Sequence, residues 1–175
     1  MDLGRAPRRG LLVCHTLELL ELAIWIGELV VIMAAVIPAV FNSFGMEPGG
    51  RFLTRVFDGY NRAVAAAILV LVSAAAWRIW VHRRSESAVT RLELLLLVVM
   101  IVVAAAIGLV LGPESVRLQE QAFAAQEEAA RKAALDAFFR THAVVRGLYV
   151  VNLGLGITLL AVKLKQWMRK EVSTS

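Results

Sequence analysis

Four long stretches of apolar residues dominate this chain. They run over residues 11–41, 63–80, 94–111 and 143–162, with only scattered charged positions inside them. About 20 apolar residues are enough for an α-helix to cross the roughly 30 Å hydrocarbon core of a bilayer. The pattern therefore predicts an all-α polytopic membrane protein, a four-transmembrane-helix bundle that forms a single membrane domain over residues 1–175. The first stretch is longer than the bilayer is thick, so its helix should tilt or project from one surface.

Composition agrees with a membrane protein. Apolar residues make up 59% of the chain and charged residues 19%, and the mean hydropathy is +0.69. These values exclude intrinsic disorder and disulfide-rich scaffolds. The single cysteine, Cys14, has no partner for an internal disulfide.

The distribution of basic residues predicts how the spans are oriented. Lysines and arginines near the spans are enriched in the N-terminal tail, the second connection and the C-terminus, at Arg5, Arg8, Arg9, Arg78, Arg83, Arg84, Arg91, Lys163, Lys165, Arg169 and Lys170. Because cytoplasmic segments carry an excess of Lys and Arg, we expect N-in/C-in topology, with both termini cytoplasmic, in a bacterial inner (plasma) membrane. The net charge of +5 then follows from orientation, and no nucleic-acid partner is expected.

The three connections differ in character. Residues 81–93 form a short basic cytoplasmic connection, whereas 42–62 and 113–142 are extracytoplasmic. Arg51, Arg55, Asp58 and Arg62 recur at helical spacing, which predicts an amphipathic helical lead into the second span. Residues 113–142 are rich in Ala, Glu and Gln, so we expect a helical connection between spans 3 and 4 that extends outside the membrane. No internal repeat is expected beyond this pairing of helices into hairpins.

The first span carries an unusual number of polar residues. At 100° per residue, one helix face holds His15, Glu18, Glu21 and Glu28. A charged side chain at bilayer depth costs about 2.5–3.5 kcal/mol. This polar stripe should therefore face other helices or a wet cavity.

The fourth span offers partners for this stripe. His142, Arg146, Tyr149 and Gly156 cluster on one face, with Asn152 at its margin. The antiparallel course of the first and fourth helices places Arg146 nearest to Glu28 among the three glutamates. We therefore predict a Glu28–Arg146 interaction, either direct or through water or Asn152.

Two readings of the stripe remain open. The glutamates can hold helices together by interhelical hydrogen bonds, or they can line a path for a cation or proton. Glu18 can also reach the cytoplasmic interface by itself. Cys14, with His15 and Glu18, has the donor types of a soft-metal site, although a small apolar role for Cys14 is the more ordinary one.

Catalysis is not expected. The chain has no P-loop, CxxC, HExxH or nucleophile–base motif, so we do not expect an enzyme. His15 and His142 should lie near opposite membrane faces, which argues against a shared haem. No catalytic, cofactor-binding or metal-binding residue is assigned.

Several short motifs resemble a known family. They are His15 ahead of Trp25-Ile26-Gly27, then Pro38-Ala39-Val40-Phe41, Gly50/Phe57/Tyr60, Leu111-Gly112-Pro113, Phe138-Phe139-Arg140-Thr141-His142 and Asn152-Leu153-Gly154. In these the chain resembles the transmembrane protein 205-like family, also called domain of unknown function 4149. The resemblance implies a four-span bundle and a role in export or tolerance of metal-like compounds. It points to His15, Pro113, Arg140, His142 and Asn152, whereas Glu18, Glu21, Glu28 and Arg146 are not fixed features of the family.

Two functions from different classes follow. The first is transport, export or tolerance of a small solute or metal-like cation through the polar stripe. The second is a structural or accessory subunit of a larger membrane complex, in which buried polar groups fix helix packing. A polar cavity that touches Glu21 and Glu28 favours the first, and a dry, fully paired bundle favours the second. The expected partners are the lipid bilayer and either a homo-oligomer or a larger complex.

Overall fold

The protein is a bundle of four long helical segments. The computed structural model describes residues 5–81 and 89–172, and every secondary-structure element in them is helical. Four segments are long and apolar enough to cross a membrane: Leu12–Phe44, Met46–Val81, Arg91–Ala124 and Glu128–Met168. The predicted all-α, four-span architecture is confirmed at this level, and each helix runs beyond the apolar stretch that predicted it.

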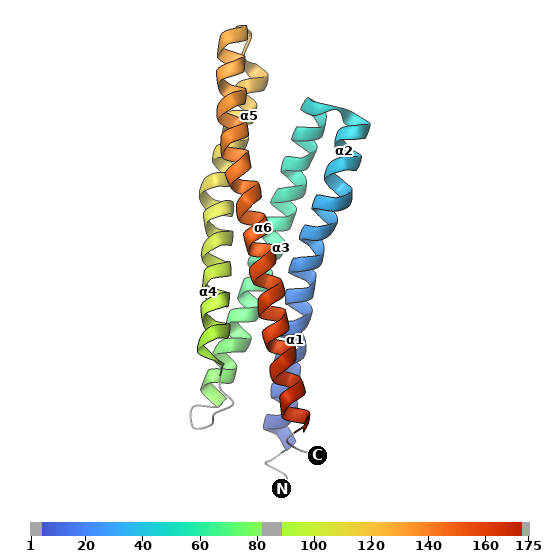
Figure 1. Cartoon of the computed structure of the whole chain (residues 1–175), viewed down its shortest axis with the longest axis vertical. Helices are drawn as coiled ribbons and strands as arrows, with labels where there is room; N and C mark the ends of the chain where they lie inside the picture. The colour runs from blue at the N-terminus through green and yellow to red at the C-terminus, as the bar shows by residue number, and fades with distance from the viewer. Residues whose placement is uncertain (1–4, 82–88, 173–175) are drawn as a thin grey trace.

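The elements form two helical hairpins. The first hairpin, residues 5–81, consists of α1 (Arg5–Val31), a π-helical turn η1 (Ile32–Val36), α2 (Ile37–Phe44) and α3 (Met46–Val81). The second hairpin, residues 91–172, consists of α4 (Arg91–Ala106), a π-helical turn η2 (Ile107–Leu111), α5 (Gly112–Ala124) and α6 (Glu128–Val172). Both hairpins start and finish at the same end of the bundle (Figure 1). The order of elements is the same in both hairpins, which is the pairing of helices into hairpins that the sequence suggested.

The connections at the end of the bundle opposite the chain termini are more helical than ordinary loops. In the first hairpin the chain reverses at Gly45, whose φ of 74° is a conformation that glycine adopts without steric cost. The predicted helical lead is confirmed, since α3 starts directly afterwards at Met46. In the second hairpin the connection is helical as predicted but is divided, because the backbone is extended at Ala125 (φ −68°, ψ 123°). No Gly or Pro marks that break, so helix propensity did not reveal it.

Each outgoing helix widens by a π-helical turn just before a proline. Pro38 and Pro113 lie in the first turns of α2 and α5, directly after η1 and η2. A proline lacks the N–H for an i−4 bond and clashes with that carbonyl, and a π-turn is one way to absorb such a misfit. At Gly112 a Cβ would lie 2.8 Å from the Ile107 carbonyl oxygen, so a larger residue there would require the backbone to shift.

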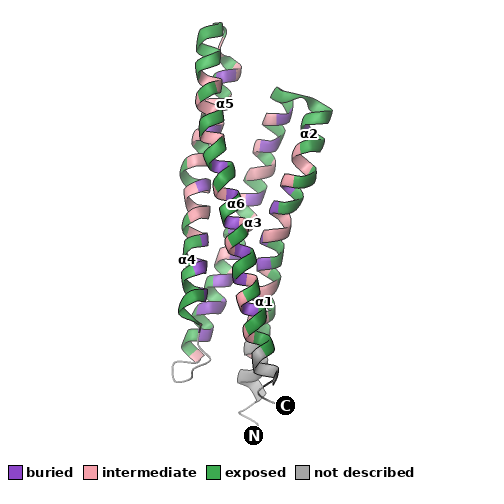
Figure 2. Ribbon diagram, in the orientation of Figure 1, coloured by how far each residue is buried: buried purple, intermediate pink, exposed green. Residues whose placement is uncertain are grey.

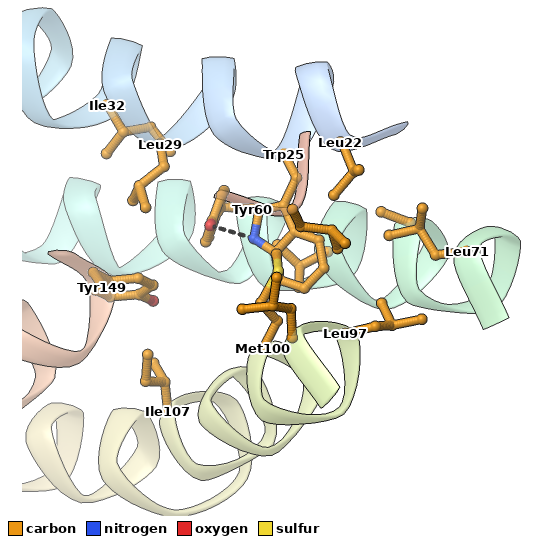
Figure 3. Packing of buried hydrophobic residues seen from close by; sticks show 14 of the residues in the cluster. Leu22, Trp25, Leu29, Ile32, Tyr60, Leu71, Leu97, Met100, Ile107 and Tyr149 are labelled. Carbon is orange, nitrogen blue, oxygen red and sulfur yellow. Dashed lines mark hydrogen bonds between the residues drawn. The ribbon is translucent and has the colours of Figure 1, made fainter. Parts of the chain in front are cut away.

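Apolar side chains fill the centre of the bundle and also cover its outside. Leu22, Trp25 and Leu29 of α1 pack with Leu71 of α3 and Met100 of α4 in one cluster (Figure 3). Exposed positions dominate the outward helix faces (Figure 2), and large apolar side chains occupy many of them, as at Leu69 and Leu109. An apolar exterior is the surface that a lipid environment requires.

Candidate functional site

Four charged side chains, one from each long helical segment, meet inside the bundle. They are Glu18 of α1, Arg78 of α3, Glu93 of α4 and Lys163 of α6, and we call them the charge tetrad. Their exposed fractions are 1%, 2%, 2% and 8%, respectively. All four side chains are therefore buried inside the bundle.

Hydrogen bonds join the tetrad into a closed ring. Arg78 Nη1 donates to Glu18 Oε2 at 3.0 Å and to Glu93 Oε1 at 2.7 Å. Lys163 Nζ donates to Glu18 Oε2 at 2.8 Å and also to Glu93 Oε1. Each carboxylate thus binds both cations and each cation binds both carboxylates. The formal charges sum to zero.

Local helix chemistry helps to position these groups. Thr90 is the N-cap of α4 and accepts a hydrogen bond from the Glu93 backbone N–H at 3.3 Å. Gln166 of α6 donates to the same Thr90 hydroxyl at 3.2 Å, which ties the start of α4 to α6. Glu93 lies in the first turn of α4 and Arg78 in the last turn of α3, where the helix dipoles favour a negative and a positive charge.

Pairing between opposite charges, and not burial itself, stabilises the tetrad. Removing charges from water is costly, and loss of one partner leaves an uncompensated charge behind. Two of its atoms, Arg78 Nε and Glu93 Oε2, are buried without a hydrogen-bond partner among the described residues. The ring is therefore neutral but not fully hydrogen-bonded.

Sequence reasoning identified only one member of the tetrad. Glu18 was a candidate, but Arg78 and Glu93 were assigned to the cytoplasmic connection and Lys163 to the C-terminus. These three lie at the edges of the apolar stretches, and the helices continue past those edges. The sequence held one signal for them. Each of the three lies within about one helical turn of the end of an apolar stretch, so a helix that continues past that end includes it.

The residues of the predicted polar stripe on α1 lie in different environments. His15 is partly buried, with Nδ1 3.6 Å from Glu18 Oε2. Glu21 is partly buried and lies outside the tetrad. Glu28 is partly buried and lines a groove of about 300 Å³, whose other lining residues are Val31, Ile32, Arg55, Val56, Gly59, Tyr60 and Ala63. The groove reaches Glu28 but is not lined by Glu21.

The predicted direct Glu28–Arg146 pair is wrong. Arg146 is exposed, and no ion pair joins it to Glu28 within residues 5–81 and 89–172. The face of α6 that is turned inward carries Val145 and Tyr149, and Arg146 lies one helical step of about 100° away from Val145. Arg55 of α3, not Arg146, is the cation that shares the groove with Glu28.

The remaining candidates on α6 do not converge on one site. Arg140 is exposed, and His142 is partly buried with its ring stacked on Phe138 at 5.3 Å between centroids. Asn152 is buried, and its Oδ1 has no partner among the described residues. His142 precedes Lys163 by 21 residues of continuous helix, which is about 30 Å. Because His15 lies beside the tetrad, the two histidines are too far apart to bind one haem iron.

Aromatic side chains form a layer farther from the chain termini than the tetrad. Trp25 Nε1 donates to the Tyr60 hydroxyl at 3.1 Å (Figure 3). The ring of Tyr60 lies 5.8 Å from that of Tyr149, and Phe57 stacks on Tyr149 at 5.4 Å. Among the residues that the structure describes, no group of three or more His, Cys, Asp or Glu is arranged to hold a metal ion.

Comparison with known proteins gives a family but no activity. No curated protein and no solved structure matches the chain. The family described as Domain of unknown function (DUF4149) matches residues 20–124. This match covers more than half of the chain, from α1 through α5, and includes Glu28, Arg78 and Glu93. The protein is therefore a four-helix membrane protein that belongs to the DUF4149 family.

Proposed function

We propose that this protein transports, exports or confers tolerance to a small solute or metal-like cation, and that the charge tetrad is a gate at one end of the path. The observation that carries the proposal is the burial of four interlinked charges, one from each long segment. Buried ion pairs contribute little net stability compared with apolar packing, so stability alone does not explain them. We propose no catalytic activity.

The tetrad has the chemistry of a gate. Each of its carboxylates binds both Arg78 and Lys163. A proton or solute cation that neutralises Glu18 or Glu93 would release one of these bases. Since the bases lie on α3 and α6, their release weakens the contact between the two hairpins. Paired repeats that move against each other are a common design of membrane transporters.

An apolar layer separates the tetrad from the groove at Glu28. Leu22, Trp25 and Leu29 are almost fully buried between these two regions of α1. The path is therefore closed in this conformation, and passage requires the hairpins to separate. The resemblance to transmembrane protein 205-like proteins favours a metal-like cargo.

The orientation that we propose has both termini in the cytoplasm of a bacterial inner membrane. It rests on the Lys and Arg distribution in the terminal segments and second connection. The tetrad then lies toward the cytoplasmic side and the groove toward the outside.

Flux through reconstituted vesicles tests the proposal. Purified protein in vesicles would be given Zn²⁺, Mn²⁺ or a proton gradient, with an internal dye as the readout. We expect movement of at least one cation, and a flux about tenfold higher in Glu18→Gln, because loss of that charge releases a base of the gate. Glu47→Gln is the matched control, because Glu47 forms an exposed pair with Arg51. Absence of flux for the whole panel, with folded protein in the vesicles, contradicts the proposal.

The single cysteine provides a second readout of gate opening. Cys14 is partly buried one turn before Glu18. If the tetrad closes this end, Glu18→Gln should raise the rate at which a thiol reagent labels Cys14, while Glu47→Gln should leave it unchanged. Equal labelling rates in all three proteins would mean that the tetrad does not control access.

A structural or accessory subunit is the second candidate. It is favoured by the buried apolar layer around Leu22 and Trp25 and by the pairing of every charge in the tetrad with two opposite charges. This candidate predicts no flux in vesicles. It also predicts a stoichiometric partner protein or a homo-oligomer when the chain is purified from native membranes and its assembly mass is measured.

A further inference from the structure

The outgoing helices of the two hairpins match at a separation of 75 residues. Leu17-Glu18-Leu19-Leu20 in α1 is repeated as Leu92-Glu93-Leu94-Leu95 in α4. The same separation relates η1 to η2 and Pro38 to Pro113. The acids of the tetrad, the π-helical turns and the prolines therefore occupy equivalent places.

The returning helices match at a separation of 85 residues. Both bases of the tetrad, Arg78 and Lys163, are related in this way. Five further buried positions of each helix are related in the same way: Tyr60, Val64, Ala67, Leu71 and Ala74 in α3, and Val145, Tyr149, Asn152, Gly156 and Leu159 in α6. Ala75 departs from the match, because it is buried while its counterpart Leu160 is only partly buried. The extra residues of the second hairpin lie in its longer outer turn, beyond Pro113.

Contacts across the bundle follow the same correspondence. Glu18 binds Arg78 of its own hairpin and Lys163 of the other, while Glu93 binds Lys163 of its own hairpin and Arg78 of the other. Likewise α1 contacts α3 and α6, and α4 contacts α6 and α3. The contact of α1 with α6 is more extensive than that of α4 with α3, so the correspondence is approximate. This reciprocal pairing is the pattern expected for two hairpins related by an approximate two-fold axis.

Ordinary helix periodicity does not account for this agreement. Any two amphipathic helices can be aligned on buried positions spaced three and four residues apart. That spacing does not require a glutamate, a π-helical turn and a proline to share one separation, nor a base to occur at the matching place on each return helix.

We propose that the chain is an internal duplication of one two-helix unit, and that the inner face of each hairpin is a surface for a second copy of that unit. The bundle is then built like a homodimer whose subunits are joined by the connection between Val81 and Arg91. Its halves run in parallel, as repeats related by an axis along the membrane normal do. This inference does not depend on transport.

Exchange of the two bases in the full chain tests the equivalence of the halves. Arg78→Lys combined with Lys163→Arg should keep the midpoint of thermal unfolding within about 3 °C of the natural protein. Lys163→Gln, which removes a base without replacing it, should lower the midpoint far more. If the exchanged protein is as unstable as Lys163→Gln, the two positions are not equivalent and the proposal fails.

Cleavage of the folded protein tests the self-recognising surface. A protease site would be inserted between Val81 and Arg91 and cut after purification in mild detergent. We expect the two hairpins to remain together, as shown by the mass of the complex. The same cleavage in Glu18→Gln/Glu93→Gln should release them, and Glu47→Gln is the control that should not. Separation of the cut but otherwise natural protein would overturn the proposal.

Discussion

The tetrad and the groove at Glu28 differ in how their charged residues are buried and paired. In the tetrad, Glu18 and Glu93 are almost fully buried, and each binds two cations. In the groove, Glu28 is partly buried and Arg55 is exposed, and they form no ion pair within the described residues. Burial and pairing go together because an isolated charge in an apolar interior is too costly. Stability should therefore depend on the charges of the tetrad and hardly on those of the groove.

The largest expected effect follows removal of Arg78. Arg78→Gln leaves two buried carboxylates to share Lys163, so we expect a loss of about 3–5 kcal/mol in the free energy of unfolding, measured by denaturation in detergent or lipid. Arg55→Gln, in the same helix but at the groove, is the matched control and should cost little. A fully stable Arg78→Gln protein would show that the tetrad does not hold the bundle.

A double-mutant cycle measures the pairing itself. Lys163→Gln should be clearly destabilising, and Glu18→Gln combined with it should lose less than the sum of the single changes, because the second change removes the charge that the first left unpaired. We expect a coupling free energy of about 2 kcal/mol, within the range for residues in direct contact. Additive losses would place the two side chains in independent environments.

The aromatic layer should show a smaller effect. Tyr60→Phe removes the acceptor of the Trp25 indole N–H and leaves that buried donor unpaired, at a cost of about 1–2 kcal/mol. Tyr149→Phe is the comparison, since its hydroxyl makes only a long 3.5 Å contact with Asn61. The midpoint of thermal unfolding should be lower for Tyr60→Phe than for Tyr149→Phe. The reverse order would mean that the Trp25–Tyr60 bond contributes little.

The smallest expected effect concerns the pair suggested by the sequence. Glu28→Gln and Arg146→Gln should each change the free energy of unfolding by less than about 0.5 kcal/mol, and their effects should add. A measured coupling above that level would mean that the two residues interact in the membrane despite the exposure of Arg146.

Helix lengths and helix faces were predictable to different degrees. The four spans and the helical lead before Ala63 followed from apolar runs and helical spacing, because these are local properties. The face of α6 was harder to assign. The sequence placed Arg146 with Tyr149 on the inward face, whereas packing turned Val145, Tyr149 and Asn152 inward. A single helix offers several mixed faces, and only its neighbours select one.

The members of the tetrad illustrate the same limit. Glu18 stood out because it interrupts an apolar run, but Arg78, Glu93 and Lys163 lie at the edges of such runs, where charged residues are ordinary. The repeated Leu-Glu-Leu-Leu at positions 17 and 92 was visible in the sequence. The structure was needed to interpret this repeat. The two hairpins share little sequence identity elsewhere, so the match between their buried positions cannot be seen in the sequence.

The sequence by itself determined that this chain forms four apolar helices with polar residues that lipid would reject, because hydropathy and helical periodicity depend only on neighbouring residues. The tertiary structure decided which of those polar residues meet. Glu18 and Lys163 are 145 residues apart, and Arg78 and Glu93 flank a connection. Their pairing depends on how the two hairpins rotate and pack, and the need to neutralise every buried charge selects that arrangement.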